Sequence, residues 1–228
     1  MSMRFKALAA AATLTIAGGM SAAGALSASA ATPACGARCV SVFSSELGTA
    51  AQPNFIEAVL GGKASVGELV GLNRATSIDP SEDILGTAGT VSDFYAAGRV
   101  SAEVNSHYGP LTAAELEYGP LGMPTGLCVG VATVAAQNEP LTLQPCRVSS
   151  RTVFILGAPN AAHYFPIINA STTDFSRPFA MSYPRHVDTT DETLPPIRVR
   201  HLQFHGRDHT LSGTQLWGVY RGAILPAP

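Results

Sequence analysis

The side chains best suited to chemistry are the thiols of the four cysteines, Cys35, Cys39, Cys128 and Cys146. Four thiols allow three disulfide pairings, and a Cys-x₃-Cys pair with two distant cysteines could instead form a tetrahedral zinc site. An oxidising, extracellular compartment favours disulfides, whereas zinc binding or a reactive thiol is more typical of the cytosol. The chemistry of these residues therefore depends on where the chain resides.

Cys128 lies in the stretch Gly126-Leu127-Cys128-Val129-Gly130, which fits G-x-C-x-G, a thiol version of the nucleophile elbow. An elbow needs a helix after the nucleophile, and the nucleophile must be a free thiolate. Residues 129–134 are rich in β-branched side chains and run into a turn, which favours a strand. We therefore interpret Cys128 as structural and predict that the protein is not an enzyme.

Two further clusters resemble metal sites. His201, His205 and His209 recur every four residues, which on a helix would put three imidazoles on one face. Because residues 197–205 alternate like a strand and then meet Gly206, we expect structural histidines instead. The acidic run at 79–83 could bind calcium, but a proline after aspartate is typical of a turn or helix cap. No metal and no other cofactor is predicted.

A carbohydrate site would combine an aromatic face with fixed polar groups. Tyr164, Asn169, Asp174 and Tyr183 could supply both from one region of the chain. Their proximity in sequence does not establish proximity in space, and scattered surface residues are the alternative.

The N-terminus predicts export. Arg4 and Lys6 precede an apolar run from Ala7 to about Met20, and the small residues at 28–30 form a cleavage signal, so residues 1–30 are interpreted as a signal peptide. The run is too short and too rich in alanine and glycine for a membrane anchor, which needs about 20 strongly apolar residues. We expect a secreted protein that is not held at the membrane after cleavage.

The remaining chain, residues 31–228, is long enough for one domain with a substantial core. Cleavage removes two positive charges and no acidic residue, so the formal net charge changes from −2 to −4. A mildly acidic chain with 13% charged residues argues against nucleic acid as a partner. Frequent glycine and proline, 22 and 16 residues, indicate many turns and an all-β fold.

Most segments read as short strands. Residues 51–60 allow either a strand or a short helix. In residues 197–205 apolar and polar side chains alternate along the chain. After His201 the apolar residues move from odd to even positions, which predicts a one-residue offset such as a bulge. Residues 183–196 read as a long polar surface loop.

The sequence also contains internal repeats. Residues 67–85 and 138–156 each contain a polar turn, an apolar-x-Leu strand, a polar stretch and a second apolar strand. A weaker third copy runs from residue 178 to residue 219. Three such units predict a pseudo-threefold barrel with long loop insertions. The predicted repeat core consists of Leu72, Ile84, Leu143, Phe154, Gln215 and Trp217.

Residues 126–128, the strand Leu141-Thr142-Leu143-Gln144-Pro145-Cys146 and then Val153-Phe154 resemble a repeat of the ricin-type β-trefoil family, and Gln215-Leu216-Trp217 matches that family's Gln-x-Trp hairpin. The resemblance is specific for residues 118–156. It implies an all-β, β-trefoil-like fold and a disulfide between Cys128 and Cys146, whose hairpin can bring two Cα atoms to disulfide distance. Cys35 and Cys39 would then form the second disulfide.

The family's usual aspartate after the first cysteine is absent, and Phe154 and Thr152 replace the tryptophan and glutamine. The resemblance implies a lectin-like module with a degenerate sugar site and an extracellular glycan as its partner. The alternative from the same fold is a secreted interaction or inhibitor domain that binds a protein and no sugar.

Overall fold

The computed structural model describes residues 39–49, 52–53, 55–74, 79–160, 163–183, 193–206 and 210–221. The predicted signal peptide and Cys35 lie outside these ranges. The strands are β1 (Cys39–Ser44), β2 (Gly48–Thr49), β3 (Gln52–Pro53), β4 (Phe55–Val59), β5 (Val70–Arg74), β6 (Ile84–Thr90), β7 (Thr112–Tyr118), β8 (Leu127–Gly130), β9 (Glu139–Pro140), β10 (Thr142–Pro145), β11 (Val153–Leu156), β12 (Ile167–Asn169), β13 (Phe179–Ser182), β14 (Thr193–Pro196), β15 (Arg198–His201), β16 (Phe204–His205), β17 (Thr210–Leu211) and β18 (Trp217–Arg221). Short helices complete the fold: α1 (Val91–Ala96), α2 (Ala102–Tyr108) and the 3₁₀ turns η2 (Pro80–Glu82), η3 (Pro120–Gly122), η4 (Ser150–Thr152) and η5 (Gly213–Gln215).

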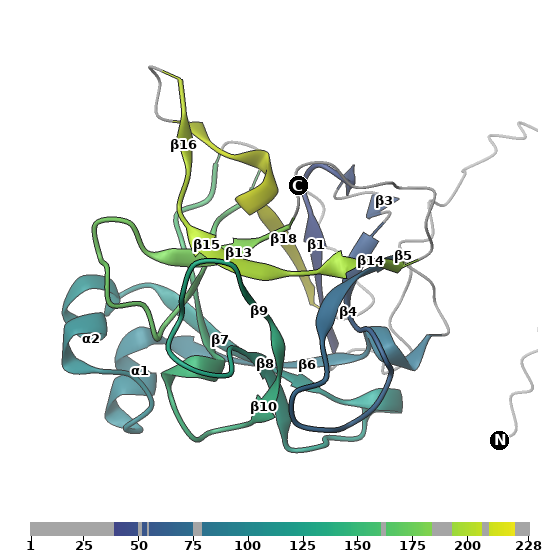
Figure 1. Cartoon of the computed structure of the whole chain (residues 1–228). Coiled ribbons are helices and arrows are strands. Elements are labelled where there is room, and N and C mark those ends of the chain that lie inside the picture. The colour runs from purple at the N-terminus through teal and green to yellow at the C-terminus, as the bar shows by residue number, and fades with distance from the viewer. Residues whose placement is uncertain are drawn as a thin grey trace, which may run out of the picture.

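The strands form three equivalent units, as the sequence predicts. Each unit has a first strand, a hairpin, a 3₁₀ turn and a last strand. Unit 1 contains β1, the hairpin β4–β5 and β6; unit 2 contains β7, the hairpin β8–β10 and β11; unit 3 contains β12, the hairpin β13–β15 and β18. The fold is therefore all-β and β-trefoil-like (Figure 1).

The first and last strands of the units are arranged around one core. Antiparallel ladders join β1, β6, β7, β11 and β12 in that order, and β18 returns to pair with β1. Between β12 and β18 there is no ladder in the described residues, only an isolated bridge between Phe165 and Trp217. The sheet is thus not closed into a continuous barrel, because one neighbouring pair is joined by that bridge alone.

A ring of three hydrogen bonds marks the pseudo-threefold axis. The Val70 N–H donates to the Leu141 carbonyl at 2.9 Å, the Leu141 N–H to the Ile197 carbonyl at 2.8 Å, and the Ile197 N–H to the Val70 carbonyl at 3.0 Å. All three side chains are fully buried. The third copy of the apolar-x-Leu strand is therefore Ile197-x-Val199, whereas residues 179–182 form the preceding hairpin strand.

The six residues predicted as the repeat core are all buried. Each last strand places one large apolar residue two positions beyond its 3₁₀ turn: Ile84 after η2, Phe154 after η4 and Trp217 after η5. These three belong to one buried cluster together with Leu72 and Leu143. The indole N–H of Trp217 donates to the Met181 carbonyl at 3.0 Å, which satisfies the ring's only donor inside the core.

The last residue of each 3₁₀ turn is polar and buried: Glu82, Thr152 and Gln215 are each no more than 1% exposed. Gln215 accepts a hydrogen bond from the Gln203 N–H at 2.7 Å and donates to the His201 carbonyl at 3.1 Å. The Gln-x-Trp pattern thus joins the turn to the neighbouring strand before the aromatic residue enters the core.

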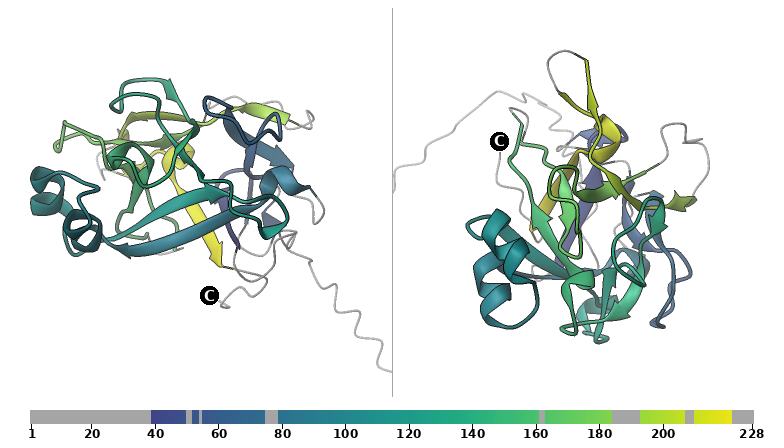
Figure 2. Two further views of the ribbon diagram at one scale, coloured as in Figure 1. Left: turned by 90° about the horizontal axis from the view of Figure 1, so that it is seen from below. Right: turned by 60° about the vertical axis from the view of Figure 1, so that its left-hand side comes forward.

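Helices α1 and α2, which the sequence analysis did not predict, are inserted between units 1 and 2. Thr90 and Asp93 form a capping box at α1, and the Ser101 hydroxyl accepts from the Val104 N–H at α2. Figure 2 shows both helices on one side of the strands, where they cover a second apolar cluster. This insertion lengthens the connection between β6 and β7.

Three local predictions have mixed outcomes. Residues 55–59 form a strand, which settles the ambiguity between strand and helix. The predicted loop lies largely outside the described residues, and its end, Thr193–Pro196, pairs with β5 as β14. After His201 the strand stops: Leu202 is 9% exposed, as the parity shift predicts, but Phe204 is 51% exposed and does not join the core.

In the ranges that the structure describes, no helix is long and apolar enough to cross a bilayer.

Candidate functional site

The disulfide between Cys128 and Cys146 is present and anchors the candidate site. Their Cα atoms are 4.9 Å apart, and Cys128 is almost fully buried in the hairpin β8–β10. Since both sulfurs are used, Cys128 is no nucleophile and no four-cysteine zinc site forms. Cys39 is also disulfide-bonded, whereas Cys35, its predicted partner, lies outside the described residues.

The described residues of the histidine and acidic clusters lie on strands and at a 3₁₀ turn. His201 and His205 lie on β15 and β16 rather than on a helix, and His209 is outside the described residues. In the acidic run, Asp79 caps η2 by accepting from the Ser81 N–H. No group of three His, Cys, Asp or Glu side chains in the described ranges could hold a metal ion.

Two of the four predicted sugar-binding residues are buried inside the protein. Asn169 is fully buried, with its amide donating to the Arg151 carbonyl at 2.9 Å. Tyr183 is 2% exposed; its hydroxyl donates to Glu46, its ring packs edge-on against Trp217, and burial raises its pKa. A ligand in solution cannot reach these side chains, so the predicted four-residue site does not form.

The other two predicted residues are accessible, but each already makes contacts within a different part of the protein. Tyr164 packs edge-on against Phe43, with ring centroids 6.0 Å apart. The Asp174 carboxylate closes its own loop: hydrogen bonds from the Ser176 hydroxyl and the Arg177 N–H lower its pKa. Sequence alone does not distinguish a polar side chain that bonds inside the fold from one that faces a ligand.

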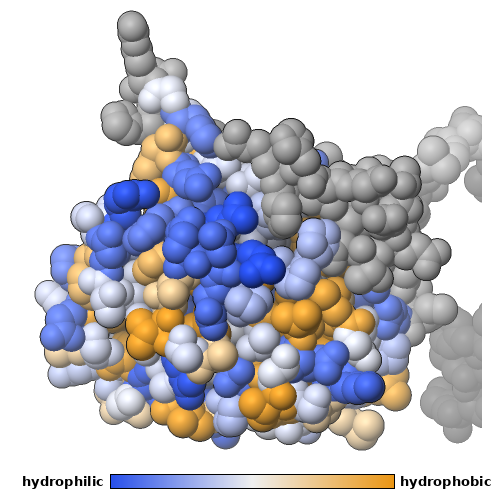
Figure 3. Space-filling model, viewed as in Figure 1, coloured by the Kyte–Doolittle hydropathy of each residue, from blue (hydrophilic) through white to orange (hydrophobic). Residues whose placement is uncertain are grey.

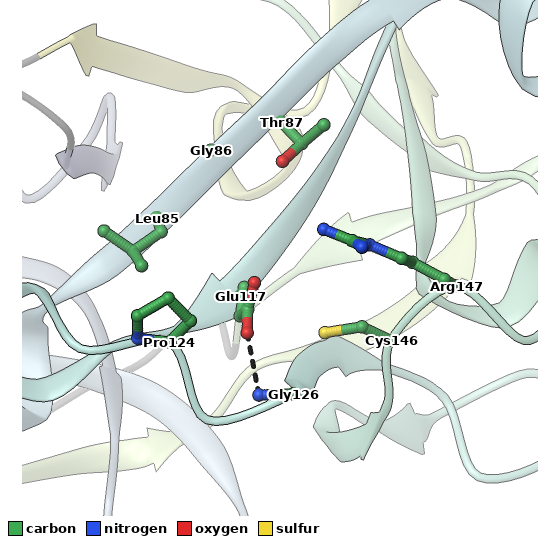
Figure 4. Close-up of a pocket in the computed structure, with 8 residues that line it drawn as sticks. All are labelled: Leu85, Gly86, Thr87, Glu117, Pro124, Gly126, Cys146 and Arg147. Carbon is green, nitrogen blue, oxygen red and sulfur yellow. Dashed lines mark hydrogen bonds between the residues drawn. The ribbon is translucent and has the colours of Figure 1, made fainter.

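The structure instead forms a pocket between units 1 and 2, bordered by strands β6 and β7 and the two ends of the disulfide hairpin. Its volume is about 480 Å³, within the range of small-molecule sites. It is lined by Leu85, Gly86, Thr87, Glu117, Pro124, Gly126, Cys146 and Arg147. Figure 4 shows Arg147 reaching from the turn after Cys146 toward the strands that carry Thr87 and Glu117.

Glu117 provides the acidic side of the pocket. It lies on β7, opposite Leu85 on one neighbouring strand and Cys128 on the other. One carboxylate oxygen accepts from the Gly126 N–H at 2.7 Å (Figure 4). Gly126 has a φ of +75°, a conformation that glycine adopts without strain. The hydrogen bond fixes the carboxylate while its second oxygen stays available to a ligand.

Arg147 provides the basic side and is held at its backbone. Its N–H donates at 3.2 Å to Glu115, a buried carboxylate that also accepts from the Thr152 hydroxyl at 2.7 Å and pairs with Arg99. The side chain of Arg147 is exposed, and its guanidinium has no hydrogen bond or ion pair in the described part of the chain. The sequence predicted none of Thr87, Glu117 and Arg147, although Arg147 follows a predicted disulfide cysteine.

A second polar surface covers another part of the molecule. In Figure 3, hydrophilic residues gather over β13 and β15, and apolar ones occur in separate areas. Arg198 and Arg200 alternate with buried Val199 and therefore share the outer face of β15. The Arg198 guanidinium donates to the Asn138 carbonyl at 2.7 Å. This surface is polar, and it lies apart from the lining residues of the pocket.

No protein-family model matches the sequence, and no curated protein is similar to it. The designed threefold-symmetric protein ThreeFoil is 9% identical, with a TM-score of 0.50 over 79% of this chain and 96% of that one. A mosquitocidal holotoxin and the cytolethal distending toxin of Actinobacillus actinomycetemcomitans are each 10% identical with TM-scores of 0.49, covering 80% and 86% of this chain. This chain spans 17% of the holotoxin chain and 99% of the other. Identities this low bear on the fold alone, and the threefold neighbour agrees with the three units found here: the chain has a β-trefoil-like fold.

Proposed function

We propose that the protein is exported and binds carbohydrate in the pocket between units 1 and 2. The observation that carries this proposal is the lining of the pocket, which combines a carboxylate, a guanidinium and a hydroxyl in a hollow of about 480 Å³. Leu85 and Pro124 are its main apolar residues. A ligand rich in hydroxyl groups can pair with such a lining, whereas an apolar ligand would leave the polar groups without water or partners.

Two other observations support this function. The hairpin that borders the pocket is the segment that resembles a ricin-type repeat, a family of carbohydrate-binding trefoils. The disulfides agree with an oxidising compartment, and so does the signal-peptide pattern at residues 1–30. Export would place the pocket where extracellular glycans are found.

The test is a glycan array with the oxidised protein, followed by calorimetry on the best ligand. Glu117→Gln keeps an oxygen for the Gly126 N–H but removes the charged acceptor, so affinity should fall about 10- to 100-fold, as for a charged hydrogen bond of about 1.5–3 kcal/mol. Glu103→Gln, on the exposed face of α2, is the matched control and should leave affinity unchanged. Absence of glycan binding, or equal weakening by both variants, would contradict the proposal.

A second candidate, a secreted protein ligand, is supported by exposed apolar side chains next to the pocket. Leu121, Met123 and Val148 are each 62% exposed and are close in sequence to the lining residues Pro124 and Arg147. Exposed apolar side chains that gather on a surface mark many protein interfaces. Capture of one secreted protein that is lost in Met123→Gln, in a chain that binds no glycan, would favour this alternative.

A further inference from the structure

Arg147 stands in a backbone conformation that suits glycine better than arginine. Its φ is +62°, in the left-handed region, where a non-glycine residue costs on the order of 1 kcal/mol. Asn138 has a similar φ of +66°, but asparagine tolerates this region, because its short side chain bonds locally. Backbone strain of this kind is concentrated at functional sites. The strain at Arg147 therefore points to a role for its side chain.

The strained conformation is held from both sides. The preceding residue, Cys146, is tied to Cys128, and its N–H donates to the Gly126 carbonyl at 2.9 Å. The N–H of Arg147 itself is bound by Glu115, which is 4% exposed and fixed by the Arg99 ion pair. The turn cannot relax without breaking these contacts, so a ligand that binds the guanidinium does not have to order the backbone that carries it.

The pocket keeps its two charges apart. In the described ranges no ion pair joins Arg147 to Glu117, and the two side chains enter the pocket from opposite sides (Figure 4). Arginine recognises carboxylates through two parallel N–H donors, whereas a carboxylate such as Glu117 accepts from hydroxyl groups. A ligand that satisfies both sides carries an acidic group at one end and hydroxyl groups at the other.

We propose that Arg147 selects carboxylated sugars, such as uronic or sialic acids, as the ligands of this pocket. The guanidinium binds the sugar carboxylate in a bidentate manner, and Glu117 and Thr87 bind its hydroxyl groups. This inference rests on the proposed carbohydrate-binding function and specifies its ligand class.

The experiment compares oligosaccharides that contain glucuronic acid with the same oligosaccharides after reduction of their carboxylates to alcohols. The wild-type protein should prefer the acidic form about 10- to 100-fold, the range expected for a charge-assisted hydrogen-bonded pair. Arg147→Gly should abolish this preference while the melting temperature stays the same or rises, because glycine relieves the left-handed backbone. Arg147→Lys should retain only part of the preference, since lysine lacks the planar fork.

Asn138→Gly is the matched control, because it makes the same backbone change at an exposed position outside the pocket. It should leave both affinities unchanged. Equal binding of acidic and reduced oligosaccharides, or an unchanged preference in Arg147→Gly, would overturn the role of Arg147 but leave carbohydrate binding in place. If neither form binds and a broad array is also negative, the proposed function itself fails.

Discussion

Glu57 occupies a position that the threefold symmetry assigns to the core. On β4 it pairs with Leu72, just as Val129 pairs with Leu143 on the hairpin of unit 2 and Met181 pairs with Val199 on that of unit 3. Val129 and Met181 are fully buried apolar residues. Glu57 is 1% exposed, and among the residues that the structure describes neither of its carboxylate oxygens has a hydrogen-bond partner. A carboxyl group thus replaces an apolar side chain in one of three equivalent places.

The consequence is a stability that depends on pH. Burial raises the pKa of Glu57 from 4.5 to about 8, so the group is neutral in the folded protein at pH 7 and ionised in the unfolded chain. A group whose pKa is raised on folding contributes stability below its unfolded pKa, and that stability is lost as the pH rises toward the folded pKa. The free energy of unfolding should therefore fall by about 1.4 kcal/mol per pH unit between about pH 5 and 8, or about 3 kcal/mol by pH 7.

Urea unfolding of the oxidised protein from pH 5 to 9 measures this slope. Glu57→Gln preserves the shape but cannot ionise, and Glu57→Met copies the residue found in unit 3. Both variants should lose the Glu57 part of the slope, and Glu57→Met should also raise stability at pH 7, because it removes an unpartnered polar group. The two proteins differ at one position only, so the difference between the pH profiles of wild type and Glu57→Gln isolates Glu57. Parallel pH profiles of these two proteins would refute the reasoning.

Three further changes test the elements that build the fold and the site. Cys146→Ser opens the disulfide and should lower the unfolding free energy by about 3 kcal/mol and weaken ligand binding, both measured against the oxidised protein; unchanged stability would show that the bond is not a constraint. Trp217→Ala should cost about 3–5 kcal/mol in urea unfolding, since it empties the centre of the core, and a loss below about 1 kcal/mol would contradict its central place. Thr90→Ala removes the cap of α1 and should cost about 1 kcal/mol, with faster hydrogen exchange confined to α1 and α2; exchange spread over the strands would argue against local capping.

The sequence predicted those parts of the fold in which the same type of residue recurs in each unit. Ile84, Phe154 and Trp217 were found because a large apolar residue closes each unit, and the Cys128–Cys146 pair was found because its repeat is the best preserved. The third copy was predicted only as the span from residue 178 to residue 219, and the structure places its apolar pair at Ile197 and Val199, beyond the connection that follows β13. Helices α1 and α2 were missed because each is only two turns long, although the Thr90-x-x-Asp93 capping box is a readable signal.

The site was less predictable than the fold for a physical reason. Asn169 and Tyr183 have the polar atoms that a ligand site needs, but in this fold those atoms bond to the Arg151 carbonyl and to Glu46. Thr87 and Glu117 come from different units and meet only because β6 pairs with β7. The residue type shows that a side chain can form hydrogen bonds, whereas only the packed structure determines which partner it bonds to.

The three units have diverged in a way that concentrates rigidity beside the pocket. Unit 2 alone combines the hairpin disulfide, the buried Glu115 with its three donors and the strained turn at Arg147. Unit 1 lacks that hairpin disulfide and has an unpartnered carboxyl in its core. A left-handed arginine persists only where its surroundings resist relaxation, and those surroundings are the contacts found in unit 2. The pocket therefore depends on contacts in which the units differ, rather than on the features that all three share.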